Sequence, residues 1–112
     1  MKLSLKEIRN REQWISKGYQ LPLFNIETVR AKTLANPVWI HFGAGNIFRV
    51  FPAVLQQKLL DEGLTDRGII VAEAFDEEII DKAYTPFDNL SLMVTLNANG
   101  SISKQVVASV VH

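Results

Sequence analysis

Two glycines separated by one residue, Gly43 and Gly45, form the part of this sequence best suited to bind a phosphate group. They follow a short apolar run, residues 38–42, and precede a segment whose apolar residues recur at helical spacing. Between a strand and a helix, the first glycine permits a tight turn and the second lets the backbone approach a pyrophosphate, which the free N–H groups of the helix attract. The pattern predicts a dinucleotide-binding turn, and the alternative is a tight turn that binds nothing. The predicted cofactor-binding residues of the turn are Gly43, Ala44, Gly45, Asn46 and Ile47.

Phe48 occupies the position at which the usual dinucleotide pattern has a third glycine. That glycine lets the helix pack closely against the strand, and a phenyl ring prevents the same approach. We therefore expect this helix to sit differently on the strand, or the ring of Phe48 to point away from it.

An acidic residue at the end of the second strand is the usual partner of such a turn, because its carboxylate hydrogen-bonds the adenosine ribose. Glu73 and Asp76 follow the apolar run 68–72, both farther from Gly45 than the roughly 20 residues of the general rule. Either carboxylate would repel the 2′-phosphate of NADP, so the sequence favours NAD as the cofactor. Glu73 and Asp76 remain alternatives for this role.

Arg49 lies on the first helical turn after the glycines, at a position suited to meet a phosphate or a substrate carboxylate. A solvated surface position is an equal alternative for an arginine on a helix. His41 lies inside the run 38–42 with no acid or nucleophile visibly paired with it, so we interpret it as a structural residue. With two histidines and no cysteine, a zinc site would have to draw on carboxylates, and we predict neither a metal site nor a catalytic residue in this chain.

Strands and helices alternate along the chain in the order that such a turn requires. Apolar residues at helical spacing follow the glycines as far as Gly63, although Pro52 should make the helix begin nearer Arg49 or bend. A right-handed crossover makes the strands on either side of this helix parallel, which predicts an α/β fold. The other predicted elements are strands at 38–42 and 68–72, a helix at 76–84, and a β-hairpin of 90–96 and 102–111 around Asn97-Ala98-Asn99-Gly100.

Residues 1–37 form a leader ahead of the domain that we predict at 38–112. A capping box at Ser4 opens a short helix in the leader, and Asn25 or Thr28 opens a second one. The chain shows neither an internal repeat nor a low-complexity tract, so we expect one domain behind this leader.

Composition excludes several classes of protein. The 112 residues carry 12 basic and 12 acidic side chains, so no net positive charge attracts nucleic acid. The absence of cysteine excludes a disulfide framework and agrees with a reducing compartment. No apolar run reaches the ~18–20 residues that a membrane helix needs, and the charged start of the chain lacks the apolar stretch of a signal peptide. We expect a cytoplasmic protein that binds neither nucleic acid nor membrane.

The segment from Trp39 to Arg49 contains the string HFGAGNI-x-R, which resembles the polyol-specific long-chain dehydrogenase family. That family includes mannitol dehydrogenase, the fructuronate (mannonate) and tagaturonate (altronate) reductases, and mannitol-1-phosphate dehydrogenase. The similarity continues through 68–72 into the predicted hairpin. The leader around 21–25 looks like the segment that precedes the first strand in the sugar-acid and mannitol branches. Phe48 departs from the phosphate-type members, which often have glycine at that position.

The resemblance implies an N-terminal Rossmann domain that binds NAD(H) and a C-terminal, largely helical domain that binds a polyol or sugar acid. Family members transfer hydride between the nicotinamide and a secondary alcohol or ketone without a metal. The residues that match the family's dinucleotide motif are Gly43, Gly45, Asn46 and Arg49, with Glu73 or Asp76 as the ribose-binding acid.

The family's catalytic lysine, asparagine and histidine lie in the substrate domain, beyond residue 112 of this sequence. We therefore expect the chain to be part of a longer enzyme and to turn over no substrate by itself. The alternatives are a stand-alone nucleotide-binding module, or an interaction domain that pairs through an unprotected strand edge at 102–111. Mannitol/fructose or mannonate/fructuronate chemistry is expected rather than that of phosphate esters. The sequence leaves the particular substrate and the oligomeric state open.

Overall fold

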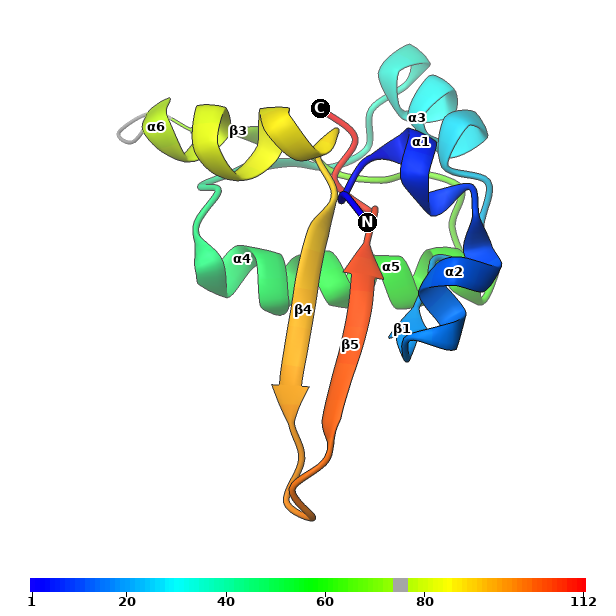
Figure 1. Ribbon diagram of the computed structural model, residues 1–112. Helices are drawn as coiled ribbons and strands as arrows, with labels where there is room; N and C mark the ends of the chain where they lie inside the picture. The colour runs from blue at the N-terminus through cyan, green and yellow to red at the C-terminus, as the bar shows by residue number, and fades with distance from the viewer. Residues whose placement is uncertain (74–76) are drawn as a thin grey trace.

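A computed structural model describes residues 1–73 and 77–112, which form two small β-sheets packed with helices (Figure 1). One sheet has the strand order β1-β5-β4, and the other pairs β2 with β3. The strands are β1 (Tyr19–Gln20), β2 (Ile40–Phe42), β3 (Ile70–Ala72), β4 (Ser91–Leu96) and β5 (Ile102–Val107). The helices are α1 (Leu5–Ile8), α2 (Arg11–Ser16), α3 (Ile26–Ala35), α4 (Asn46–Val50), α5 (Pro52–Asp61) and α6 (Glu77–Ile79), then a π-helix (Ile80–Tyr84) and a 3-10 helix (Thr85–Phe87). In the part of the chain that is described, no helix is long and apolar enough to cross a membrane.

The predicted βαβ unit is present, and its strands β2 and β3 are parallel as expected from a right-handed crossover. The α/β fold class is therefore confirmed. The helical segment between the two strands is divided, because α4 ends before Phe51 and α5 begins at Pro52. At the first position of a helix, proline costs no intrahelical hydrogen bond. The helix thus bends at this point, which is one of the two outcomes expected from Pro52.

Residues 109–112 lie along the side of β3 opposite to β2 and act as a third parallel strand. The Ile69 N–H donates to the Ser109 carbonyl at 2.7 Å, and the Val111 N–H donates to the Ile69 carbonyl at 2.9 Å. The prediction of one continuous strand over 102–111 is therefore wrong. The chain leaves the hairpin sheet after β5 and joins the other sheet beside β3.

Two residues far from this segment in the sequence, Gln57 and Gly68, allow the chain to pass from one sheet to the other. Gln57 is fully buried on α5, and its side-chain amide donates to the Val106 carbonyl at 2.6 Å and accepts from the Ala108 N–H at 2.5 Å. The backbone that leaves the hairpin sheet therefore stays hydrogen-bonded. Gly68 approaches the same segment so closely that a β-carbon would lie 2.5 Å from the Ser109 carbonyl oxygen. The apolar pattern of residues 106–111 does not indicate that Gln57 and Gly68 contact this segment.

The predicted β-hairpin forms from the antiparallel strands β4 and β5, and residues 97–100 make the hairpin turn. Figure 1 shows the hairpin crossing α4 and α5 and projecting beyond them at this turn. Over residues 104–105, β5 also pairs with β1, which makes it the central strand of its sheet. The edge that was expected to be unprotected along this strand is therefore covered by β1 at residues 104–105.

The leader packs against the second half of the chain. Ser4 caps α1, because its Oγ accepts the Glu7 N–H at 3.2 Å. Asn25 rather than Thr28 caps α3, because Asn25 Oδ1 accepts the Thr28 N–H at 2.9 Å. The core cluster that joins the leader to the hairpin contains Ile8, Trp14, Leu21, Leu90, Val106 and Ala108. The domain boundary at residue 37 stays a prediction.

The helical spacing after the glycines correctly predicted helix, but the residues that define the spacing lie mostly on the exposed face. The side chain of Ile47 is 81% exposed and that of Phe51 is 62% exposed. The core side of the two helices is formed instead by residues such as Phe48, Ala53 and Leu60. The exposed apolar residues of β2, of α4 and α5, and of the junction between the two helices are Ile40, Phe42, Ile47, Val50, Phe51, Leu55 and Leu59.

Candidate functional site

The glycine turn, residues 43–45, connects the carboxyl end of β2 to the first residue of α4. The Gly43 N–H donates to the Ala72 carbonyl at 2.8 Å, which extends the pairing of β2 with β3 by one residue. Gly43 has φ +111°, a left-handed conformation that residues with side chains rarely adopt. This position therefore requires glycine for its backbone conformation.

Gly45 contributes the open space in front of the turn. Apart from its chain neighbours, no described atom lies within 4 Å of the position that a β-carbon would take. Asn46 and Ile47, which follow it on α4, are exposed. A cavity of about 400 Å³ opens on this side of the turn. It is lined by His41, Gly43, Gly45, Asn46, Ile47, Phe48 and Pro52.

Ala44 lies on the opposite, buried side of the turn and has no exposed surface. Its N–H donates to Glu73 Oε2 at 2.8 Å, and its carbonyl accepts from the Tyr84 hydroxyl at 3.0 Å. Glu73 directly follows β3, and Tyr84 is the last residue of the π-helix. Two elements far along the chain therefore fix the middle residue of the turn.

Glu73 is brought to the glycine turn, as expected for the acid at the end of the second strand. Glu73 is half-buried, and its carboxylate accepts the Ala44 N–H. It directly follows Ala72, whose carbonyl accepts the Gly43 N–H. Asp76, the alternative acid, lies outside the described residues. The negative charge thus lies beside the turn that is predicted to hold the cofactor.

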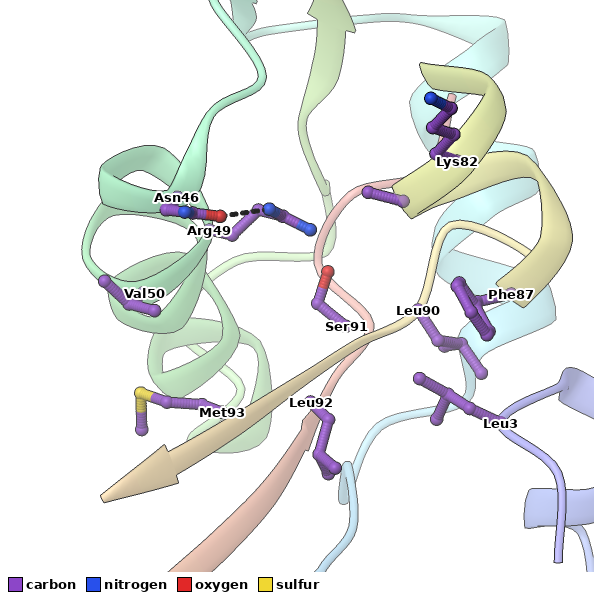
Figure 2. Close-up of a pocket in the computed structure, with 11 residues that line it drawn as sticks. Leu3, Asn46, Arg49, Val50, Lys82, Phe87, Leu90, Ser91, Leu92 and Met93 are labelled. Atoms are coloured by element: carbon purple, nitrogen blue, oxygen red, sulfur yellow. Dashed lines mark hydrogen bonds between the residues drawn. The ribbon is translucent and has the colours of Figure 1, made fainter. Parts of the chain in front are cut away.

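Arg49 extends from α4 toward Ser91 at the start of β4 (Figure 2). Its guanidinium donates to Oδ1 of Asn46 and lies 5.6 Å from the centroid of the Tyr84 ring, in a cation–π contact. Arg49 and Lys82 border a second cavity of about 420 Å³, so an anionic group is favoured there. Arg49 Nε and Ser91 Oγ are buried without a hydrogen-bond partner among the described residues. Arg49 is therefore not simply a solvated surface residue.

Tyr84 is a residue of the site that the sequence analysis missed. Burial raises its pKa to about 12, with Arg49 lowering this pKa and Glu73 raising it. The phenol therefore stays protonated, and remains a hydrogen-bond donor, well above neutral pH. A buried tyrosine needs a partner for its hydroxyl group, but residue spacing does not indicate which partner that is.

Phe48 points into the core rather than away from the strand. Its ring stacks on that of His41 with 4.3 Å between the ring centroids, and it packs in the same cluster as Ala44 and Ala53. The ring therefore does not point away from the strand, which was one of the two expected outcomes. It fills the space between helix and strand, and the helix packs around it. Within residues 1–73 and 77–112, His41 belongs to no group of three side chains that could hold a metal ion.

The chain is similar along its whole length to a sugar-acid oxidoreductase. It is 46% identical over 112 residues to the D-mannonate oxidoreductase of Thermotoga maritima, and it spans 21% of that protein's length. No protein-family model matches the chain.

Two solved structures share its fold. The substrate-free D-sorbitol dehydrogenase gives a TM-score of 0.75. The mannitol 2-dehydrogenase of Pseudomonas fluorescens, in a ternary complex with NAD and D-mannitol, gives 0.74. Each is 19% identical to this chain and matches 98% of it, and the match covers 21% of the neighbour. The Rossmann-type fold and the resemblance to the mannitol dehydrogenase and mannonate reductase family are confirmed.

Proposed function

We propose that this chain is the NAD(H)-binding part of an oxidoreductase that transfers hydride between a nicotinamide cofactor and a polyol or sugar acid. The observation that carries the proposal is the 46% identity to D-mannonate oxidoreductase, which extends over the whole chain. This relative favours mannonate and fructuronate as the substrate pair over mannitol and fructose. A stand-alone nucleotide-binding module would use the same turn, but no observation favours it specifically.

The open side of the glycine turn has the properties that a pyrophosphate requires. The first N–H groups of a helix have no partner within that helix, and Gly45 keeps the space in front of α4 clear. Asn46 and Ile47 are exposed at the same cavity, and Asn46 also borders the second cavity, where Arg49 supplies positive charge. These residues fit the diphosphate of NAD(H), which when bound supplies or accepts the hydride.

We assign the adenosine ribose to Glu73 rather than to Asp76. The contact between Glu73 Oε2 and the Ala44 N–H keeps this carboxylate against the turn. A carboxylate accepts hydrogen bonds from ribose hydroxyls, and its charge repels the 2′-phosphate of NADP. The proposed cofactor is therefore NAD rather than NADP.

We place the substrate-binding and catalytic groups on a further domain of the complete protein. The chain spans about a fifth of the length of its curated relative, 21%. The family resemblance assigns a lysine, an asparagine and a histidine of that further domain to the proton transfer and to the polarisation of the carbonyl group. The chain described by the structure would then supply the cofactor half of the active site.

The first test is binding of NADH to the protein expressed from the complete reading frame that contains this sequence. Binding should be saturable, should compete with NAD, and should be detected by energy transfer from Trp39, which is half-buried in the segment leading into β2. Gly45→Val should abolish binding, because its side chain fills the space in front of α4. Ala98→Val, at the exposed hairpin turn, is the matched control and should bind normally.

The second test is the reaction itself. Reduction of D-fructuronate by NADH should exceed reduction of D-fructose, and NADPH should support either reaction poorly. A folded protein that binds no NADH would overturn the proposed function. NADH binding combined with faster reduction of D-fructose would retain the oxidoreductase and overturn the preferred substrate.

A further inference from the structure

We propose that Tyr84 is a positioning residue of the cofactor site, because its hydroxyl group orients the peptide group between Ala44 and Gly45 so that the Gly45 N–H faces the open side of the turn. This inference rests on the proposed function, since it concerns the same turn. It assigns a role to a side chain that lies 40 residues beyond the turn in the sequence and that the dinucleotide pattern does not include.

The hydrogen bond from Tyr84 fixes one end of this peptide group. The hydroxyl donates to the Ala44 carbonyl at 3.0 Å, and both residues are buried, with 2% of the Tyr84 side chain exposed. The peptide group is planar and trans, as no peptide bond in the described structure is cis. In a trans peptide the N–H points away from the carbonyl. The carbonyl of Ala44 points inward to Tyr84, so the N–H of Gly45 points outward.

The outward direction is the direction from which a cofactor would approach. Gly45 is exposed, and nothing but its chain neighbours lies within 4 Å of its β-carbon position. A second contact restrains the preceding peptide group, because the Ala44 N–H donates to Glu73 Oε2. Because both polar groups of the Ala44 backbone are bonded inward, the following N–H, that of Gly45, is presented to the cavity together with the first N–H groups of α4.

Tyr84 also contacts the other end of the motif. The Arg49 guanidinium lies over its ring at 5.6 Å from the centroid. The hydroxyl and the ring thus act on different parts of the site, and Tyr84→Phe removes the first contact while it keeps the second. The ring packing in the core is retained in that variant, so its effect reports on the hydroxyl group alone.

Without the hydroxyl group, the Ala44 carbonyl would be buried without this donor. A buried carbonyl that lacks a partner is costly, and the peptide group can recover a partner by rotating toward water. Rotation of the carbonyl moves the Gly45 N–H away from the cavity by the same angle. The loss should therefore appear in cofactor affinity more than in the packing of the core.

The test compares Tyr84→Phe with Tyr19→Phe in the protein from the complete reading frame. Tyr19 is the other tyrosine of the sequence and lies on β1, in contact with Trp14 and Lys104. Tyr84→Phe should weaken NADH binding on the order of tenfold, as expected for one misdirected hydrogen bond. It should also slow hydrogen exchange of the Gly45 amide in the absence of cofactor, because the rotated peptide group turns this N–H away from the open side of the turn. Tyr19→Phe should change neither quantity.

Two further results separate this inference from the proposed function. Unchanged NADH affinity and unchanged Gly45 exchange in a folded Tyr84→Phe protein would overturn the role of Tyr84 while leaving the cofactor site intact. If the unmodified protein binds no NADH, the proposed function fails, and the exchange rate of Gly45 still decides whether Tyr84 orients the turn. Replacement of Tyr84 by p-aminophenylalanine, which restores a donor, should return both the NADH affinity and the exchange rate of the Gly45 amide toward those of the unmodified protein, and failure to do so in a folded protein would contradict the inference.

Discussion

The glycine turn and the hairpin turn each contain a glycine in a left-handed conformation, but the hydrogen bonds that fix the two turns come from different parts of the molecule. Gly43 has φ +111° and Gly100 has φ +86°. In the hairpin turn the hydrogen bonds are local: the Gly100 N–H donates to the Asn97 carbonyl at 3.0 Å, and the Asn97 N–H donates to the Ser101 carbonyl at 2.8 Å. In the glycine turn the partners come from β3, from the residue that follows it, and from the π-helix.

This difference shows how the candidate cofactor site depends on the rest of the fold. The backbone of Ala44 is held in its orientation by hydrogen bonds to Glu73 and Tyr84, which lie much later in the sequence. The hairpin turn needs only its own residues and the two strands beside it. We therefore expect changes at the glycine turn to affect both stability and cofactor binding, and changes at the hairpin turn to leave cofactor binding unchanged.

The largest effect is expected from a large side chain on the buried side of the glycine turn. Ala44→Leu should lower the free energy of unfolding by about 3 kcal/mol, because Ala44 is fully buried and packs in the core cluster with Phe48 and Tyr84. Ala98→Leu, at the exposed hairpin turn, should change it by less than about 0.5 kcal/mol. Thermal unfolding of the two variants measures the difference. Equal stabilities would contradict the assignment of Ala44 to the core.

Alkaline pH should weaken the glycine turn and leave the hairpin turn, which has no titratable side chain, unaffected. Burial raises the pKa of Tyr84 to about 12, above its ordinary value of 10, because it disfavours the phenolate. The resulting stability, about 2 kcal/mol, is present below pH 10 and is lost as the pH rises toward 12. Unfolding measured against pH should show this loss in the unmodified protein. The same profile in Tyr84→Phe would exclude Tyr84 as its source.

A smaller effect is expected when each left-handed glycine is replaced. Gly43→Ala and Gly100→Ala should each cost about 1–2 kcal/mol of stability, since a side chain is strained at positive φ. Only Gly43→Ala should also weaken NADH binding, because only this residue lies in the candidate cofactor site. Titration with NADH distinguishes the two variants. A loss of affinity in Gly100→Ala would show that the hairpin turn takes part in cofactor binding.

The smallest effect is expected at the side chain of Asn97. Its amide donates to Ser101 Oγ at 3.1 Å and to Ser103 Oγ at 2.9 Å, bonds that lie at the surface of the hairpin. Asn97→Ala should therefore lower the free energy of unfolding by about 0.5 kcal/mol and leave NADH affinity unchanged. Chemical unfolding checks the first value. A destabilisation of several kcal/mol would mean that the hairpin turn is not held by its own backbone.

Elements that depend on neighbouring residues were predicted correctly from the sequence. The helix cap at Ser4, the glycine turn between strand and helix, and the hairpin around residues 97–100 are examples. Each rests on a conformational preference or a hydrogen bond within a few residues, which the sequence contains directly. The bend at Pro52 follows from the same kind of local constraint.

The candidate site was predicted in part. The sequence indicated that the turn residues and one of two acids, Glu73 or Asp76, come together, because a strand, a turn, a helix and a second strand in this order bring them to the same edge of a parallel sheet; the structure has Glu73 at the turn. Tyr84 was missed, since a tyrosine among apolar residues at helical spacing indicates only that it is buried. The direction of Arg49 toward Ser91 likewise depends on where β4 crosses α4 (Figure 2).

The sequence by itself determined the order of the elements, the parallel βαβ unit and the glycines of the turn, because these follow from local backbone preferences and from the handedness of the crossover. The tertiary structure decided which face of α4 and α5 is buried, where the chain leaves the hairpin sheet, and what holds Ala44. These features depend on contacts between residues far apart in the chain, such as Gln57 with Ala108 and Tyr84 with Ala44. Such contacts form only when packing has brought the elements together, so no local pattern specifies them.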